Sequence, residues 1–262
     1  MTESELALTW PVWTVAAAAI LAAGFTQGAL GFGFPAISTP VLVLITDVKT
    51  AIILNLLPNF IVNLIGVMRG GNWHASLGKY WPVAIYVLIG SFLGAQFLIF
   101  APQEPVRLLL ALIIIAYLNQ QRLARLNWSW LTHYPRLSEF AFGMTGGFFS
   151  GSVNNSLPPL LIYFMLLGVE ATIMTQILNL CFLGGKVVQA ATLGLAGEIR
   201  LSAALANLPL TLIALIRLYG GTRLQKRFSA QAYNRALRTV LAVIALVLIW
   251  QGAGYFLAPR LA

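Results

Sequence analysis

Charged residues are scarce in this chain. They make up 9% of its 262 residues, whereas hydrophobic residues make up 59%. A soluble domain carries roughly 25% charged residues, so the composition excludes an ordinary soluble protein. The apolar runs are long and continuous and do not alternate with period two, which excludes a transmembrane β-barrel. The sequence therefore predicts an all-α polytopic membrane protein with about eight to ten hydrophobic segments of roughly 20 residues and no soluble domain.

Cysteine and histidine are also rare, and the acidic residues fall at segment ends. The one cysteine, Cys181, cannot form an intrachain disulfide. His74 and His133 lie in loops without metal-ligand spacing. Neither a nucleophile–base pattern nor a phosphate-binding loop occurs, so we expect no enzymatic activity, no metal and no cofactor. A membrane-embedded enzyme would need an acidic, histidine or cysteine constellation at depth, which the chain lacks.

The few charges are unequally divided between the two signs. The chain has 16 Lys and Arg against 7 acidic residues, a net charge of +9. Excess Lys and Arg marks the cytoplasmic loops of membrane proteins, so we attribute the charge to topology and expect no nucleic-acid partner. The N-terminus carries Glu3 and Glu5 but no basic residue, which is unlike a cleaved signal peptide. We therefore expect the first apolar run to remain in the mature protein.

Ten apolar segments can be delimited along the chain. They span residues 10–31, 35–46, 48–68, 80–100, 105–119, 138–151, 156–168, 170–195, 201–219 and 233–256. The first two of each half form a pair with short members. A segment of about 12 residues forms a helix of roughly 18 Å, too short for a hydrocarbon core of about 30 Å.

The second half of the chain repeats the first at an offset that drifts from roughly 119 to 128. The aligned pairs are Gly24 with Gly143, Gly28 with Gly147, Gly31 with Ser150, Gly33 with Ser152, Pro40 with Pro159, Pro82 with Pro209, Gly94 with Gly221 and Arg107 with Arg235. We therefore predict two repeats of about five segments each, residues 1–119 and 138–262, joined by a basic linker, 120–137.

Basic residues in the linker and in the stretch 217–238 place both in the cytoplasm. Between them, segments 170–195 and 201–219 supply two crossings, so the pair 138–168 must begin and end on the same side. The same reasoning places residues 69–79 inside and the N-terminus, Asp47 and the C-terminus outside. The two repeats are therefore expected to be inverted, as in many secondary transporters whose substrate site lies between the repeats near the midplane.

Gly-rich and Pro-rich stretches in each repeat predict broken-helix hairpins that meet near the membrane centre. Irregular backbone at that depth is tolerated only against protein or a water-filled cavity. Free N–H groups at the start of the new helices would form an anion site. The alternative is that the glycines only allow close helix packing. The backbone residues assigned to the hairpins are Gly28, Gly31, Gly33, Pro35, Gly147, Gly151 and Pro158.

Lys186 is the most informative single residue, because it lies in the interior of an apolar segment. A lysine at the bilayer centre costs roughly 2.5–3.5 kcal/mol and marks function by default. No acidic residue is placed to pair with it, so we expect its ammonium to face an anionic substrate. The alternative is a lysine that points into a wet vestibule without a specific role.

Neutral polar residues surround this lysine in the predicted arrangement. Asn55, Asn59 and Asn63 recur every four residues and form a stripe on segment 48–68, and a second stripe lies on segment 170–195. Amide N–H groups suit sulfonate or carboxylate oxygens, whereas the alternative role is interhelical hydrogen bonding. The candidate substrate-binding residues are Lys186, Gln27, Asn154, Asn155, Ser150, Ser152, Asn55, Asn59, Gln176, Asn179, Gln189 and Thr26.

The two Gly-rich stretches resemble the signature of the TauE/SafE sulfite exporter family. The stretch "GFTQGALGFGFPAISTPVLVL" (24–44) is similar to its G-x-x-x-G-x-x-G-x-G-G-G pattern followed by Pro-x-Leu, and "GMTGGFFSGSVNNSLPPLL" (143–161) lies where the family repeats the motif. The triple glycine reads "GFGFP" in the first copy and "GSVNNS" in the second. The resemblance covers nearly the whole chain. It implies transport of small anions such as sulfite, organosulfonates or related sulfur and carboxylate compounds.

The sequence thus favours a secondary transporter in the bacterial cytoplasmic membrane; the family resemblance favours export, and the direction of transport stays open. Its expected partners are a small anion and the lipid bilayer. Three forms of coupling stay open: uniport, symport of the protonated acid, and protonation of Lys186. An anion channel of the same architecture and a membrane-embedded assembly or structural protein are the alternatives, and the oligomeric state stays open.

Overall fold

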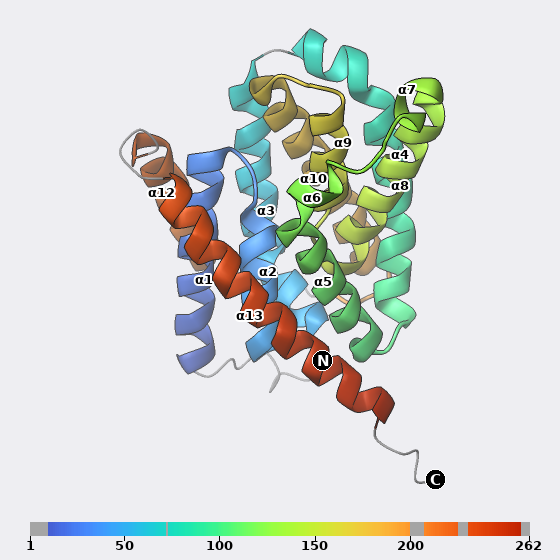
Figure 1. Ribbon diagram of the computed structural model, residues 1–262. Helices are drawn as coiled ribbons and strands as arrows, with labels where there is room; N and C mark the ends of the chain where they lie inside the picture. Colours follow the sequence, from blue (N-terminus) through green and yellow to red (C-terminus); the bar gives the residue numbers. More distant parts are fainter. Residues whose placement is uncertain (1–9, 72, 200–206, 225–229, 258–262) are drawn as a thin grey trace.

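The structure of the protein is a computed structural model that describes residues 10–71, 73–199, 207–224 and 230–257. Within these ranges all regular structure is helical (Figure 1). Four of the described helices are long and apolar enough to span a membrane, and three shorter apolar helices accompany them. The predicted all-α polytopic membrane fold is confirmed.

The described helices follow the predicted segments closely. In chain order they are α1 (Trp10–Leu30), α2 (Phe34–Ile45), α3 (Val48–Gly70), α4 (Trp73–Phe100), α5 (Gln103–Leu118), α6 (Gln120–Leu123), α7 (Trp130–His133), α8 (Pro135–Val153), α9 (Leu157–Leu166), α10 (Ala171–Leu195), α12 (Leu208–Leu224) and α13 (Ala230–Leu257). Residues 201–206 of the predicted segment 201–219 lie outside the described residues.

The helices depart from the prediction mainly at α4, α8 and α12, and the linker contains two short helices, α6 and α7, that were not predicted. α12 ends at Leu224, five residues after the predicted end at residue 219. α4 begins at Trp73, seven residues before the predicted start at residue 80, because polar residues that end a hydrophobic segment do not end a helix. α8 begins at Pro135 and ends at Val153, so it is longer than the predicted segment 138–151. A proline is favoured in the first turn of a helix, where its missing N–H group is not needed. The short members of the two pairs are therefore α2 and α9 alone.

α1 and α2 form the first hairpin, which opens toward the lower end of Figure 1. Gly31 and Gly33 make its turn with φ angles of 83° and 106°, a region that residues with a side chain rarely adopt. Pro35 takes the second position of α2, one residue after the first position, which proline favours. The second position tolerates proline equally well because first-turn amides have no intrahelical acceptor. The 12 residues of α2 make a helix of about 18 Å, which ends well short of a full crossing.

α8 and α9 form the second hairpin, which opens toward the upper end of Figure 1, opposite to the first. Asn154 makes its turn with φ 58°, and asparagine is one of the few residues with a side chain that adopt this conformation routinely. Pro158 lies at the second position of α9, the same shift by one residue that Pro35 shows. Pro159 follows it, so two consecutive positions of the first turn have no N–H group.

Three glycines assigned to the hairpins lie on helix faces instead of in turns. A Cβ atom at Gly28 would lie 2.2 Å from the carbonyl oxygen of Leu218, in α12. At Gly147 and Gly151, the nearest carbonyl oxygens of α4 would lie 2.3 and 2.0 Å away. These glycines therefore allow α1 to approach α12 and α8 to approach α4 at backbone contact, which is the packing alternative noted above. Only Gly31 and Gly33 serve the turn itself.

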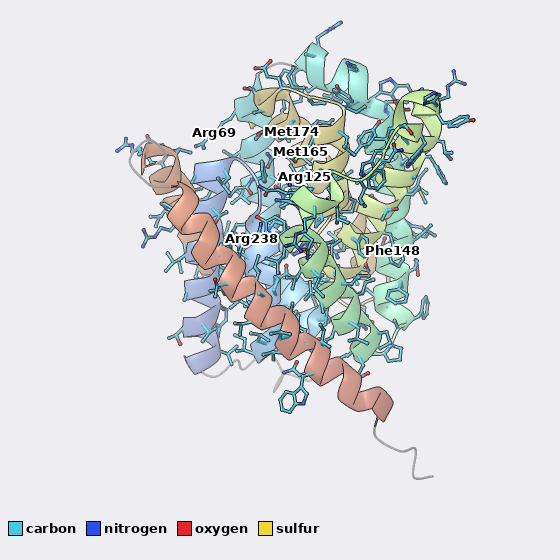
Figure 2. The ribbon with its side chains drawn as sticks, in the orientation of Figure 1. Arg69, Arg125, Phe148, Met165, Met174 and Arg238 are labelled. Atoms are coloured by element: carbon cyan, nitrogen blue, oxygen red, sulfur yellow. The ribbon has the colours of Figure 1, made fainter. Side chains whose placement is uncertain are left out.

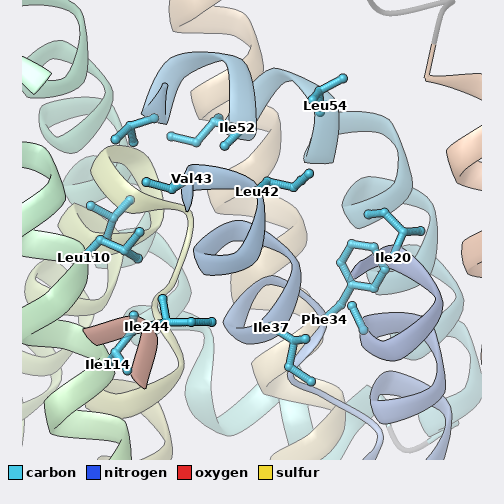
Figure 3. Close-up of a cluster of buried hydrophobic side chains, with 14 of the residues drawn as sticks. Ile20, Phe34, Ile37, Leu42, Val43, Ile52, Leu54, Leu110, Ile114 and Ile244 are labelled. Carbon is cyan, nitrogen blue, oxygen red and sulfur yellow. The ribbon is translucent and has the colours of Figure 1, made fainter. Parts of the chain in front are cut away.

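The main apolar core surrounds α2. Figure 3 shows Phe34, Ile37, Leu42 and Val43 of this helix among side chains from α1, α3, α5 and α13. A short helix cannot reach both membrane surfaces, so its own ends are held by neighbouring helices rather than by the interfaces. The core thereby fixes the start of α2, and with it the turn of the first hairpin, in the interior of the protein.

We predict that Gly94→Ala destabilises the protein. The added methyl would lie 2.1 Å from the carbonyl oxygen of Phe148, so α4 and α8 must separate, at a cost of about 1–3 kcal/mol. The melting temperature in detergent checks this. The control is Gly220→Ala in α12, where no atom lies within 4 Å of the new methyl, and this variant should melt no lower than the original protein. Equal melting of the two variants would contradict the prediction.

Candidate functional site

Lys186 of α10 is buried in the interior of the protein, with 1% of its surface exposed. Its ammonium donates hydrogen bonds to the side-chain oxygens of Asn154 and Gln189. Both acceptors are neutral amides, and no carboxylate contacts the ammonium within the part of the chain that the structure describes. A lysine ammonium has three donors, so two of the three are used by these amides. The predicted buried ammonium without an acidic partner is therefore what the geometry shows.

Asn154 joins this lysine to both halves of the chain. Its Oδ1 accepts from Lys186 and from Asn59 Nδ2 of α3, the latter at 3.1 Å. Its Nδ2 donates to Thr39 Oγ1 of α2 at 2.8 Å. The left-handed backbone at Asn154 ends α8 and turns this side chain into the interior. The turn of the second hairpin and the second turn of α2 therefore meet directly beside Lys186.

The stripe on α3 continues the network away from the lysine. Asn55 Nδ2 donates to Thr39 Oγ1 at 3.2 Å, and Asn63 Nδ2 donates to Asn59 Oδ1 at 2.6 Å. All three asparagines are at most 2% exposed. The Oδ1 atoms of Asn55 and Asn63 are buried without a hydrogen-bond partner. Buried polar atoms of proteins are seldom left unpaired, so these two oxygens can accept hydrogen bonds from water or from a donor group of a ligand.

Gln189 anchors the lysine to the second hairpin. Its Oε1 accepts from Lys186, while its Nε2 donates to the backbone oxygens of Ser150 and Gly151 at 3.2 and 2.7 Å. Those two carbonyls belong to the last turn of α8, where intrahelical donors run out. Gln189 therefore positions Lys186 relative to the hairpin turn, rather than offering a free amide to a substrate.

Gln27 and Asn179 form a second polar cluster at the turn of the first hairpin. Gln27 Nε2 donates to Asn179 Oδ1 at 2.7 Å, and Asn179 Nδ2 donates to the backbone oxygen of Gly31 at 2.7 Å. Gln27 Oε1 accepts from the backbone N–H of Phe34 at 3.1 Å. Each hairpin is therefore held by an asparagine from the long helix of the other half: Asn179 of α10 holds the first, and Asn59 of α3 holds the second.

The remaining candidates lie outside these two clusters or use their polar groups locally. Gln176 accepts from Ser76 Oγ at 3.0 Å and donates to the backbone oxygen of Val67, so it links α10 to the α3–α4 corner. The hydroxyl groups of Thr26 and Ser152 donate to backbone oxygens one helical turn earlier. Sequence periodicity placed Gln176 on the same face of α10 as Asn179 and Lys186. It could not show how far the polar clusters extend along the helix axis.

Few backbone N–H groups are free at the starts of α2 and α9. The N–H of Phe34 donates to Gln27, and Pro35 has none. The N–H of Leu157 donates to Asn155 Oδ1 at 3.4 Å, and the next two residues of α9 are prolines. In the described hairpins, a side-chain amide therefore accepts from the first N–H group of each short helix, and prolines supply no N–H group at the positions that follow. Lys186 and the amide N–H groups of the asparagines beside it remain as candidate anion-binding groups.

Three further buried hydroxyl residues form hydrogen bonds in or beside the site. Thr39 accepts from both Asn154 and Asn55. Ser91 of α4 donates to the backbone oxygen of Gly147 at 3.2 Å, and Ser76 pairs with Gln176. A hydroxyl in an apolar segment is a weak signal, because it is satisfied by its own helix as often as by a neighbour.

The two ends of the molecule carry different features near the site. A cavity of about 360 Å³ reaches Gln27 and Gly31 and is also lined by Arg69, which Figure 2 shows in the upper part of the molecule. At the opposite end, Lys49 at the start of α3 pairs with Glu198 after α10, with 2.7 Å between Nζ and Oε1. The described structure therefore has a cavity beside the turn of the first hairpin, and an ion pair links the start of α3 to the segment after α10 at the opposite end.

A comparison with models of protein families matches residues 16–248 to the family described as Sulfite exporter TauE/SafE. Searches of curated proteins and of solved structures gave no match. The matched region includes both hairpins, Lys186 and the polar clusters around them. It covers most of the 262 residues, and the members of this family are transporters. The chain therefore belongs to the TauE/SafE sulfite exporter family.

Proposed function

We propose that the protein is a secondary transporter that exports small anions, such as sulfite, organosulfonates or related sulfur and carboxylate compounds, across the bacterial cytoplasmic membrane. One observation carries the proposal: a buried lysine surrounded by neutral amides, at the point where two broken-helix hairpins meet. The family match supports an anion substrate of this class.

The chemistry of the site supports an anion over a cation or a neutral solute. A buried ammonium without a carboxylate leaves a net positive charge in a medium where charges are expensive. A bound anion offsets that charge, and amide N–H groups replace part of its hydration shell. A site for a metal cation would need carboxylate or other anionic ligands, which the described contacts of Lys186 do not provide.

The pattern of helix packing supports the inverted repeat. α1 packs against α12, and α8 packs against α4. In the predicted alignment α8 corresponds to α1, and α12 corresponds to α4. A two-fold axis that relates the two halves would therefore convert the α1–α12 contact into the α8–α4 contact. α3 packs against α10, and α5 packs against α13. In each of these contacts a helix meets the helix that corresponds to it in the other half. Two halves related in this way supply the two alternative conformations that alternating access requires.

The cavity and the ion pair suggest how access alternates. In the conformation described, a cavity reaches Gln27 and Gly31 at the turn of the first hairpin, and Lys49 pairs with Glu198 at the opposite end. We propose that rocking of one repeat against the other breaks this ion pair and closes the cavity over Gln27 and Asn179. An exposed ion pair contributes about 0–1 kcal/mol, weak enough to break in each cycle.

We expect Lys186→Met to weaken anion binding on the order of 100-fold, equivalent to about 3 kcal/mol. The substitution removes the only charge in the polar cluster while keeping a long apolar side chain. Ligand-induced thermal shifts with sulfite, sulfonates, thiosulfate and short carboxylates measure binding, and counterflow in proteoliposomes measures transport. The control is Lys79→Met, which removes an exposed charge on α4. Normal binding by the Lys186 variant would end the proposal, and large single-channel currents would replace a carrier with a channel.

We expect Asn154→Asp to weaken anion binding without loss of fold. Aspartate tolerates the left-handed backbone at this position, and the new carboxylate would lie against the Lys186 ammonium as an internal counter-ion. Binding should weaken by at least about tenfold, while the melting temperature stays the same or rises, because the buried charge gains a partner. Unchanged affinity for every anion of the panel would show that the Lys186 ammonium does not contact the substrate.

The proposed orientation predicts a pattern of thiol labelling. After replacement of Cys181, single cysteines at positions 47 and 198 should react with a membrane-impermeant reagent from outside the cell. Cysteines at positions 74, 130 and 225 should react only in inverted vesicles, because basic loops remain in the cytoplasm. Position 225 lies outside the described residues. Labelling of positions 47 and 74 from the same side would contradict the proposed topology.

A further inference from the structure

A cavity of about 1200 Å³ lies between α5, α6, α9 and α13, and the proposed transport mechanism does not use it. A single water molecule occupies about 30 Å³ in the liquid, so a small anion of a few atoms would fill only a minor part of this space. Leu30, Phe32 and Leu161 contribute apolar lining, whereas Arg122 and Arg238 contribute charge. The cavity is therefore amphipathic and much larger than the proposed substrate.

Both charges in this cavity are positive. Arg238 of α13 donates from Nη2 to the backbone oxygen of Leu118 at 2.5 Å, which holds its guanidinium across the gap toward α5. Arg122 of α6 lines the same cavity, and no acidic residue is among the described residues of the lining. Arginine forms paired hydrogen bonds with phosphate oxygens, so two arginines on neighbouring helices suit a phosphate group.

Gln120 has an unpaired acceptor next to the cavity. The Oε1 atom of Gln120 is buried without a hydrogen-bond partner, and Gln120 lines the cavity. A sulfite dianion only accepts hydrogen bonds and would not satisfy this oxygen. A headgroup that carries hydroxyls beside its phosphate would satisfy the arginines and, when the Gln120 side chain turns toward the cavity, the glutamine as well.

The helices on either side of the cavity present apolar residues outward. Leu112 of α5 is 56% exposed, and Val243 and Leu246 of α13 are 56% and 67% exposed. Exposed apolar side chains on a membrane helix face lipid. The cavity lies at the ends of α5 and α13 that join basic segments of the chain, and Figure 2 shows Arg238 and Arg125 in this region. A lipid of the adjacent leaflet can therefore extend its headgroup into the cavity with its acyl chains along α5 and α13.

We propose that this cavity is a binding site for an anionic phospholipid with a hydroxyl-bearing headgroup, of the phosphatidylglycerol type. Arg122 and Arg238 bind its phosphodiester, and Gln120 accepts a hydrogen bond from its headgroup hydroxyl. Basic pockets between membrane helices on the cytoplasmic side bind anionic headgroups in this way. The proposed orientation places the pocket in the cytoplasmic leaflet.

Bound lipid would also contact the first hairpin. Leu30 and Phe32, which line the cavity, flank Gly31, whose carbonyl oxygen accepts from Asn179. Gly31 has a left-handed backbone and no packed side chain of its own, so the residues on either side determine how firmly the turn is held. The lipid therefore stabilises the turn of the first hairpin against the rest of the protein.

The test measures lipid binding to the purified protein in a neutral detergent, independently of transport. Native mass spectrometry counts retained lipid, and thermal shift reports stabilisation. The probes are phosphatidylglycerol, phosphatidylmethanol, which has the same charge without hydroxyls, phosphatidylcholine, glycerol phosphate, inorganic phosphate and sulfite. The variant is Arg122→Gln with Arg238→Gln, and its matched control is Arg136→Gln with Arg223→Gln, two exposed arginines that do not line the cavity.

Phosphatidylglycerol should bind and raise the melting temperature, phosphatidylmethanol should bind several-fold more weakly, and phosphatidylcholine should have no effect. The variant should lose at least tenfold in apparent affinity for phosphatidylglycerol, whereas the control should not. Equal stabilisation by glycerol phosphate, inorganic phosphate or sulfite would make the cavity a vestibule for soluble anions. Equal lipid binding by the variant and the control would place the lipid elsewhere. Either result overturns the lipid site and leaves the proposed transport function untouched.

Discussion

The burial of one ammonium inside the membrane is the constraint on which the rest of the structure depends. Lys186 is held by two neutral amide oxygens and by no carboxylate among the described residues. Amide oxygens reduce the cost of burying the charge but do not neutralise it. The site is therefore electrostatically incomplete, and an anion is the simplest group that completes it. This single feature links the architecture to the class of solute proposed for the protein.

The two hairpins exist to bring polar groups to this ammonium without exposing backbone to lipid. α2 and α9 are too short to cross a bilayer, so their first turns lie in the protein interior. Prolines reduce the number of first-turn N–H groups that need partners, and Gln27 and Asn155 cap those of Phe34 and Leu157. Glycines allow the backbones of α1 and α12, and of α8 and α4, to touch. This close packing keeps the helices together around the polar side chains at the centre.

The exchange of supporting residues between the two halves has a mechanical consequence. Asn179 of α10 holds the first hairpin, and Asn59 of α3 holds the second, so neither hairpin can shift without disturbing the long helix of the other half. A group that binds beside Lys186 is therefore in contact with both halves at once. The occupant proposed for the larger cavity contacts the same first hairpin from the side of α13, through Leu30 and Phe32.

Much of the fold followed from the sequence because membrane insertion depends on local composition. Length and hydropathy predicted the helices to within a few residues, except where α4 continues through the polar residues 73–79. The duplicated Gly-rich motif and the isolated lysine identified the family and the central residue, because glycine, proline and a buried charge are each costly in an apolar helix. Helical periodicity also placed Asn55, Asn59 and Asn63 on one face, and they do share one network.

What only the tertiary structure decided is which polar groups are free and which are occupied. The sequence could not show that Gln189 positions Lys186, that Gln176 pairs with Ser76, or that Thr39 joins Asn154 to Asn55. It also could not separate Gly31 and Gly33, which make a turn, from Gly28, Gly147 and Gly151, which allow backbone contact. Residue type and spacing fix the face on which a group lies, but its partner depends on how the helices are displaced along one another, and that is set by packing across the whole molecule.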